Sequence, residues 1–267
     1  MGRTVLFDSI TDADATAKGA IVVSGSHGGL YPAMLASRAG ARAVILNDAG
    51  IGHNHAGVAG IEALSLVGMA GAAADTHSAR IGSANDILRF GVISHVNAQA
   101  LELGVVNGAS VTEALIRMAK SPEPTGMLPK IAESRKEHRL EGTQSDILLV
   151  DSASLVTSDD AGRIIIAGSH GALIGGDPRR ALKASARFAC FNDAGIGRDK
   201  VGIGRLAALE HQGIAAVTVS HDTCVIGDAA SALETGLISA ANEQARAFGI
   251  HVNDPLRAAV MRVVAAG

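Results

Sequence analysis

The chain is an internal duplication, and this feature constrains its fold more than any other. Residues 8–29 read DSITDADATAKGAIVVSGSHGG and match residues 151–172, DSASLVTSDDAGRIIIAGSHGA, at an offset of 143 positions. The motif NDAGIG then occurs at 47–52 and again at 192–197, at an offset of 145. Matches in one order over roughly 100 residues indicate two diverged copies of one structural unit.

The repeat divides the chain into three parts. We predict one α/β unit over residues 1–120 and a second over 147–267, joined by a polar linker over 121–146. The linker contains three prolines and dense charge, and we expect it to carry one solvated helix over 129–141.

Short apolar strands alternate with helical patterns in both copies. We expect strands at 5–7, 20–24, 43–46 and 70–74, and again at 147–150, 163–167, 188–191 and 215–219. We expect helices at 30–39, 58–67 and 86–103, and again at 178–186, 202–211 and 230–248. The alternation predicts an α/β fold of duplicated, mixed but mainly parallel sheet units with helices on both faces. A pseudo-twofold axis would relate the copies, and the first two strands of each copy could form a hairpin.

Composition narrows the choice of ligand and location. The net charge is −3 without a basic run, so we expect no nucleic-acid partner. The chain has no Trp and only one Tyr, which favours a small, polar, anionic, non-aromatic ligand over one that stacks on rings. No apolar run reaches the roughly 18 residues of a membrane span, and the first residues do not resemble a secretory signal, so we expect a cytoplasmic protein without a membrane partner. The Gly- and Ala-rich helices could also form a homo-oligomer interface.

Three polar loops in each copy follow predicted parallel strands, where open α/β sheets bind ligands. The first loop, Gly-Ser-His-Gly, contains Ser26 and His27 in one copy and Ser169 and His170 in the other. Its glycines let the backbone approach a ligand, and free N–H groups at a helix start suit an anion. We predict that the histidines are catalytic acids or bases and that the serines bind substrate. The alternative is a tight turn in which each histidine caps backbone groups.

The second loop ends a strand with Asn47 and Asp48 in the first copy and with Asn192 and Asp193 in the second. We predict that each carboxylate orients a histidine, acts as a base or binds a cation, and that each asparagine contacts the substrate. The alternative is an Asx turn in which the aspartate caps the next helix.

The third loop differs between the copies. It contains His77 in the first copy, and His221, Asp222 and Cys224 in the second. We predict that His77, His221 and Asp222 contact the substrate. A nucleophilic pair of Cys224 with His170 is geometrically feasible, and the alternative is a buried, inert thiol.

Two more histidines, His53 and His55, follow NDAGIG in the first copy, where the second copy has Arg198 and Lys200. With Asp75 these histidines could supply nitrogen and oxygen ligands to a divalent metal. Arg198 could instead hold a substrate carboxylate. No GxGxxG or P-loop motif follows a strand, so we expect no nucleotide cofactor.

Two other features have a structural interpretation. Ser94 and Asn97 recur as Ser239 and Asn242, on the last predicted helix of each copy, and we expect them to make structural hydrogen bonds. Cys190 falls within a predicted strand, so we expect it in the core.

These residues favour an enzyme. Two copies that meet about a pseudo-twofold axis would bring His27, Asp48, His170 and Asp193 around one shared cleft. The first hypothesis is a hydrolase of a C–N (amide-type) or ester bond, with histidine as general base. The alternatives are an isomerase or lyase that moves a proton next to a carboxylate, a metal-dependent hydrolase, and a protein that binds a small anion without turnover.

Overall fold

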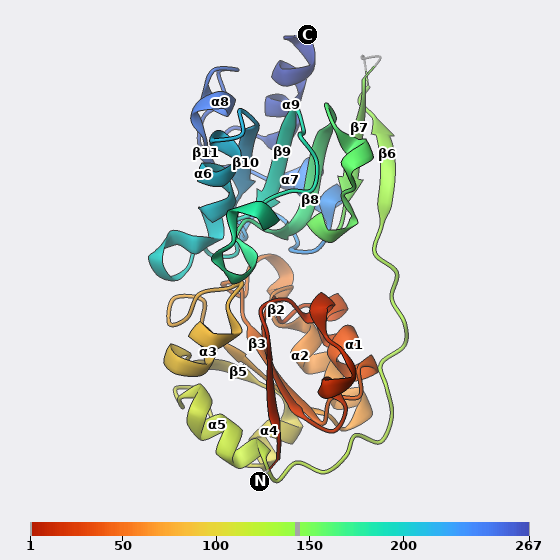
Figure 1. The fold of residues 1–267 in the computed structure, drawn as a ribbon, viewed down its shortest axis with the longest axis vertical. Coiled ribbons are helices and arrows are strands. Elements are labelled where there is room, and N and C mark those ends of the chain that lie inside the picture. The colour runs from red at the N-terminus through yellow and green to blue at the C-terminus, as the bar shows by residue number, and fades with distance from the viewer. Residues whose placement is uncertain (1, 142–144, 267) are drawn as a thin grey trace.

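Two mixed β-sheets, one in each half of the chain, form the framework of the fold (Figure 1). The computed structural model describes residues 2–141 and 145–266, so residues 142–144 of the expected linker lie outside the described residues. The first sheet has the strand order β1-β2-β3-β4-β5 and the second the order β11-β10-β9-β8-β7-β6. Most neighbouring strands run parallel and helices cover the sheets, which confirms the predicted α/β class.

The first sheet is built from β-branched and small residues. Its strands are β1 (Thr4–Phe7), β2 (Ile21–His27), β3 (Ala43–Asn47), β4 (Ala70–Ala74) and β5 (Ile93–Val96). Every residue of β2, β3 and β4 is buried, as expected of parallel strands that are covered on both sides. At one edge, β5 runs antiparallel to β4.

The second sheet repeats this plan with one more strand. Its strands are β6 (Arg135–Arg139), β7 (Asp146–Val150), β8 (Ile164–His170), β9 (Phe188–Asn192), β10 (Ala215–Val219) and β11 (Ile238–Ala241). The strands β7 to β10 run parallel, and the two edge strands β6 and β11 run antiparallel to their neighbours.

Helices lie on both faces of the sheets (Figure 1). In the first half they are α1 (Leu30–Arg38), α2 (Ala59–Ala63), α3 (Ala84–Phe90), α4 (Ala98–Glu102) and α5 (Val111–Met118). In the second half they are α6 (Gly204–Glu210), α7 (Ala229–Thr235), α8 (Glu243–Arg246) and α9 (Leu256–Ala265). Within β2, Val22 packs with α1 and α2, whereas Ile21 and Val23 pack with α3 and α5, because successive strand side chains point to opposite faces.

The last predicted helix of each copy is wrong. Residues 86–103 form most of α3, then β5 and α4, and residues 230–248 form most of α7, then β11 and α8. The helices α3 and α7 each end before a glycine, and that glycine packs against the last turn of its own helix. A Cβ would lie 2.5 Å from the Ile87 carbonyl oxygen at Gly91 and 2.4 Å from that of Ala232 at Gly236, so a larger residue would not fit.

The recurring asparagines have the structural role that we expected, although they cap helices instead of lying inside them. Asn97 caps α4 and accepts a hydrogen bond from the Gly71 N–H at 3.0 Å. Asn242 caps α8 and accepts the equivalent bond from the Ala216 N–H at 2.9 Å. Ser94 lies on β5, outside any helix.

Three further expectations are wrong. The strands β1 and β2 pair in parallel, as do β7 and β8, so neither pair is a hairpin. Residues 178–186 contain only a short 3-10 turn, Pro178–Arg180, after two glycines with positive φ at 175 and 176. The expected helix at 129–141 is replaced by β6, an edge strand whose charged side chains are largely exposed.

The two halves are stacked along the long axis of the molecule, and the chain between α5 and β6 runs along one side of both (Figure 1). Within the described ranges, the structure contains no helix with the length and apolar character needed to cross a bilayer.

Candidate functional site

The two Gly-Ser-His-Gly loops face one cleft between the halves. The strands β2 and β8 end in His27 and His170, and both side chains line a cleft of about 560 Å³. The exposed fraction is 8% for His27 and 6% for His170, so both rings are almost wholly removed from bulk water. Ser26 and Ser169 line the same cleft.

Tight backbone packing fixes the position of these loops. The Gly82 N–H donates to the Gly25 carbonyl at 2.8 Å, and a Cβ at Gly25 would lie 2.6 Å from the backbone of Gly82. The Ser26 hydroxyl accepts a hydrogen bond from the Ile10 N–H at 3.0 Å. The second copy repeats both features: Gly227 donates to Gly168, and the Ser169 hydroxyl accepts from Ala153 at 3.0 Å. Each serine therefore anchors the loop as well as lining the cleft.

His27 is an uncharged ring with its proton on Nε2. Burial lowers its pKa to about 4, so the ring is uncharged at neutral pH. Its Nδ1 accepts a hydrogen bond from the Gly29 N–H at 3.2 Å, which assigns the proton of the neutral ring to Nε2. The ring packs against the second half, because a Cβ at Gly227 would lie 3.6 Å from its Cε1 atom.

His170 is also neutral, but its hydrogen bonding differs. Burial, and then the positive charge of Arg205, lower its pKa to about 3. The Ala172 backbone, at the position equivalent to Gly29, acts in the opposite direction and raises the pKa, although the buried Nδ1 has no hydrogen bond of normal geometry in the described chain. Both equivalent histidines are therefore buried and uncharged at neutral pH, and Arg205 lies close to the second one alone.

The structure does not bring Asp48 and Asp193 into this cleft, so the expected four-residue cluster with His27 and His170 is wrong. Asp48 accepts hydrogen bonds from the N–H groups of Gly50 and Thr76, both at 2.9 Å. Because each aspartate closes its own turn, the Asx-turn alternative describes the NDAGIG loops better than the catalytic one.

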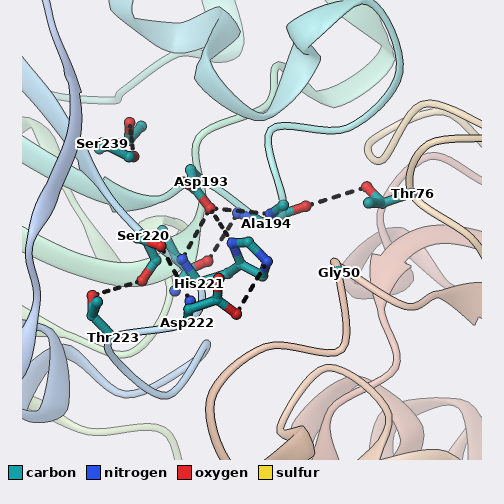
Figure 2. Close-up of polar contacts among 12 residues, drawn as sticks. Gly50, Thr76, Asp193, Ala194, Ser220, His221, Asp222, Thr223 and Ser239 are labelled. Atoms are coloured by element: carbon teal, nitrogen blue, oxygen red, sulfur yellow. Dashed lines mark hydrogen bonds and ion pairs between the residues drawn. The ribbon is translucent and has the colours of Figure 1, made fainter.

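The NDAGIG loops instead join the two halves. A Cβ at Gly50 would lie 2.7 Å from the ring of His221, so the ring packs on the backbone of the first half (Figure 2). The His53 N–H donates to the His221 carbonyl and the Arg198 N–H to the Thr76 carbonyl, both at 2.8 Å. These two bonds are equivalent under the offset of 145. Thr76 also donates its hydroxyl to the Ala194 carbonyl at 3.2 Å.

An ion pair strengthens the second-copy side of this junction. Nδ1 of His221 lies 3.0 Å from Oδ1 of Asp193, which also accepts from the His221 N–H (Figure 2). The hydrogen bond to Asp193 raises the pKa of His221. Burial opposes ionisation of Asp193, but hydrogen bonds from His221 and Ser239 outweigh it and lower the Asp193 pKa. By contrast, burial raises the pKa of Asp48 despite its bond with the Ser94 hydroxyl.

Ser239, His221 and Asp193 have the residue types of a hydrolase triad but not its geometry. The Ser239 hydroxyl bonds to Asp193 and lies 3.0 Å from the Thr218 hydroxyl, on the carboxylate side of the pair. A triad requires the serine at the far nitrogen of the histidine. We therefore assign these residues to the junction.

The remaining residues of the second and third loops have structural partners. Asn47 and Asn192 each accept from the N–H two residues on, at 2.9 Å. Cys224 is fully buried, and burial raises its pKa to about 12, so its thiol is not a nucleophile at neutral pH. Cys190 lies in the core as expected. The Asp222 side chain is 74% exposed and lies outside the cleft.

The candidate metal ligands do not converge. Nδ1 of His53 lies 3.1 Å from the Asp222 carbonyl, and His55 is exposed. Asp75 accepts from the N–H of His77, whose side chain is exposed. Across residues 2–141 and 145–266, no group of three or more histidine, cysteine or acidic side chains could hold a metal ion.

Arg198 does not reach the cleft either. Its Nη1 donates to the Ser78 carbonyl at 3.0 Å, and its guanidinium lies 4.3 Å from the ring centre of Phe90. Arg198 therefore helps to join the halves.

Sequence reasoning missed two contributors to the cleft. Arg205, only 5% exposed, lines it from α6, and the equivalent position of the first copy is Gly60. This replacement of glycine by arginine was a visible signal. Glu133 lines the cleft from the linker, beside Tyr31. Burial, and then Glu133, raise the pKa of Tyr31 to about 12.

Comparison with protein families, with curated proteins and with solved structures finds no match to this chain. The fold and the cleft define a duplicated α/β protein in which two buried histidines line a cleft between the halves.

Proposed function

We propose that the cleft is the active site of a hydrolase for a C–N (amide-type) or ester bond of a small, polar, anionic, non-aromatic metabolite. The observation that supports this most is that uncharged imidazoles from both copies line one cleft. A neutral imidazole can take a proton from water, and its N–H can stabilise a developing oxyanion.

The two histidines have different roles in this proposal. In this route His170 removes a proton from water, and the water oxygen forms a bond to the substrate carbonyl carbon. His27 donates its Nε2–H to the carbonyl oxygen as that oxygen gains the electron pair. When the pair returns, the C–N or C–O bond breaks, and the proton on His170 passes to the leaving nitrogen or oxygen.

An anionic substrate would also make His170 a better base. The charge of Arg205 lowers the pKa of His170, so an anion beside Arg205 would offset that charge and raise the pKa towards neutrality. This route needs no covalent intermediate, because water is the nucleophile, and the Cys224 thiol lies outside the cleft.

The test is a screen of small amides and esters that carry a carboxylate, with product measured directly. We expect His170→Gln and His27→Gln each to lower kcat/KM by about 10²-fold or more, while His77→Gln, an exposed histidine outside the cleft, leaves it unchanged. Turnover that neither cleft variant lowers would contradict the proposal.

Binding of an anion without turnover is the second candidate. One observation favours it: neither cleft histidine hydrogen-bonds a carboxylate within the described chain, so neither ring is oriented as in a catalytic dyad. Thermal stabilisation by small anions, with no product from any amide or ester, would support binding alone. Solvent deuterium incorporated next to a carboxylate would instead support the isomerase or lyase alternative.

Location in the cytoplasm and homo-oligomer formation stay predictions.

A further inference from the structure

Arg205 is a buried cation without an anionic partner. Its side chain lines the cleft, and its guanidinium lies 5.0 Å from the ring centre of Phe191. Burial, and then the charge of Arg180, lower its pKa to about 10. No carboxylate of the described residues pairs with it. A buried charge without a counter-ion is costly, so a protein that retains one commonly uses it for a ligand.

The hydrogen bonds of Arg205 leave one nitrogen free. Its Nε donates to the Ala172 carbonyl at 3.1 Å, and its Nη1 donates to the carbonyls of Arg180, at 3.2 Å, and Ala181. A guanidinium has five N–H donors, and these contacts use those on Nε and Nη1. Nη2 has no hydrogen bond to any residue in the described ranges, so its two donors remain for a ligand.

The other cations of the cleft already have partners. Nη2 of Arg179 lies 2.8 Å from the Asp177 carboxylate, and Nη2 of Arg180 lies 3.0 Å from that of Asp12. Lys183 is exposed and donates to a backbone carbonyl at 2.6 Å. Among the described cations of the cleft, Arg205 is therefore the buried one that lacks a carboxylate partner.

We propose that Arg205 binds the carboxylate of a monocarboxylate ligand through Nη2, beside the two imidazoles. This inference deepens the proposed function. Carboxylate binding itself does not depend on that function, and only the claim that the ligand is a substrate rests on it. One free charge and one free nitrogen match a monoanion with planar oxygens. A phosphate has up to two charges and more acceptor oxygens than this group can satisfy.

The experiment is isothermal titration calorimetry at pH 7 and constant ionic strength. The probes are short straight-chain monocarboxylates, the corresponding neutral primary amides, and inorganic phosphate. We expect at least one carboxylate to bind about ten-fold or more tighter than its amide and than phosphate, as a charge-assisted hydrogen bond predicts. Arg205→Met should reduce carboxylate affinity to that of the amide, and Lys183→Met, a matched cleft cation, should leave it unchanged.

Any one of four results would overturn the inference. They are equal binding of carboxylate and amide, tighter binding of phosphate, no binding of any carboxylate, and full carboxylate affinity in folded Arg205→Met. If Arg205→Met does not fold, Arg205→Lys replaces it as the variant, because it keeps the charge. The comparison of carboxylate with amide affinity on the natural chain also still tests the inference. Carboxylate binding that depends on Arg205, without turnover of any amide or ester, would reject the proposed hydrolase and leave this site standing.

Discussion

Nδ1 of His221 lies 3.0 Å from Oδ1 of Asp193, whereas the position equivalent to His221 in the first copy is Thr76. Both residues donate their backbone N–H to the aspartate of the same half, Thr76 to Asp48 and His221 to Asp193. The two sides of the junction thus share the same backbone hydrogen bonds, and the second side adds the contact between the His221 ring and the Asp193 carboxylate.

His221→Thr copies the first-half residue into the second half and should remove the ion pair together with the packing of the ring on Gly50, of which only the ion pair depends on pH. Because the folded pKa of His221 is raised, its contribution to stability is complete below the unfolded pKa of about 6.5 and is lost as pH rises through the folded pKa. We expect the variant to lower the free energy of unfolding by about 1–2 kcal/mol at pH 6 and by less at pH 9. Urea denaturation measures both values, and an equal loss at both pH values would contradict this account.

The two aspartates of the junction should respond differently to neutralisation. Asp193→Asn removes a carboxylate that is hydrogen-bonded to the His221 ring, and should cost about 1–3 kcal/mol. Asp48→Asn should cost less, because burial already raises the pKa of Asp48 and no cation among the described residues forms an ion pair with it. Neither change should lower turnover in folded protein, and a selective loss of turnover would return these residues to the active site.

The buried cleft histidines should make the protein sensitive to acid. Their folded pKa values, about 4 for His27 and about 3 for His170, lie below the unfolded value. The folded state therefore binds fewer protons, so their contribution is complete above pH of about 6.5 and is lost as pH falls, by up to about 2.7 kcal/mol per pH unit for two protons. The double variant His27→Gln/His170→Gln should flatten the fall in unfolding free energy between pH 6 and pH 4, and an unchanged slope would contradict the assigned burial.

The Cys224 thiol should be inert in the folded protein. It is fully buried with a pKa of about 12, and Ala79 occupies its position in the first copy. We expect no alkylation of Cys224 or Cys190 by iodoacetamide at pH 8 until denaturant is added. Cys224→Ala should retain turnover, and rapid labelling of Cys224 in native protein would show that the thiol is accessible.

The sequence was sufficient for the framework of the fold, because repetition and buried β-branched strands are strong local signals. It was insufficient for β6, since Arg135–Arg139 has the charge of a solvated helix and becomes a strand only by pairing with β7. It was also insufficient for β5 and β11, because a short strand between two short helices resembles one long helix until Gly91 and Gly236 are seen packed against the turn before them.

For the site, His27 and His170 line one cleft, whereas Asp48 and Asp193 do not, and a catalytic role stays a prediction for the histidines alone. Asp48 and Asp193 also follow parallel strands, but their carboxylates turn back onto the N–H groups of the adjacent loop. That choice depends on three-dimensional packing at the junction. Arg205 was not predicted, because it does not belong to a motif that both copies share. The first copy has Gly60 at the equivalent position.

The most direct test of the central claim is a long-range ¹H–¹⁵N spectrum of the histidine rings, assigned with His27→Gln and His170→Gln. The account predicts that both rings stay neutral from pH 7 down to at least pH 5, and that a monocarboxylate shifts both signals together with one dissociation constant. Rings that protonate near the ordinary value of about 6.5, or a ligand that shifts one ring and not the other, would show that the two copies do not share one buried cleft.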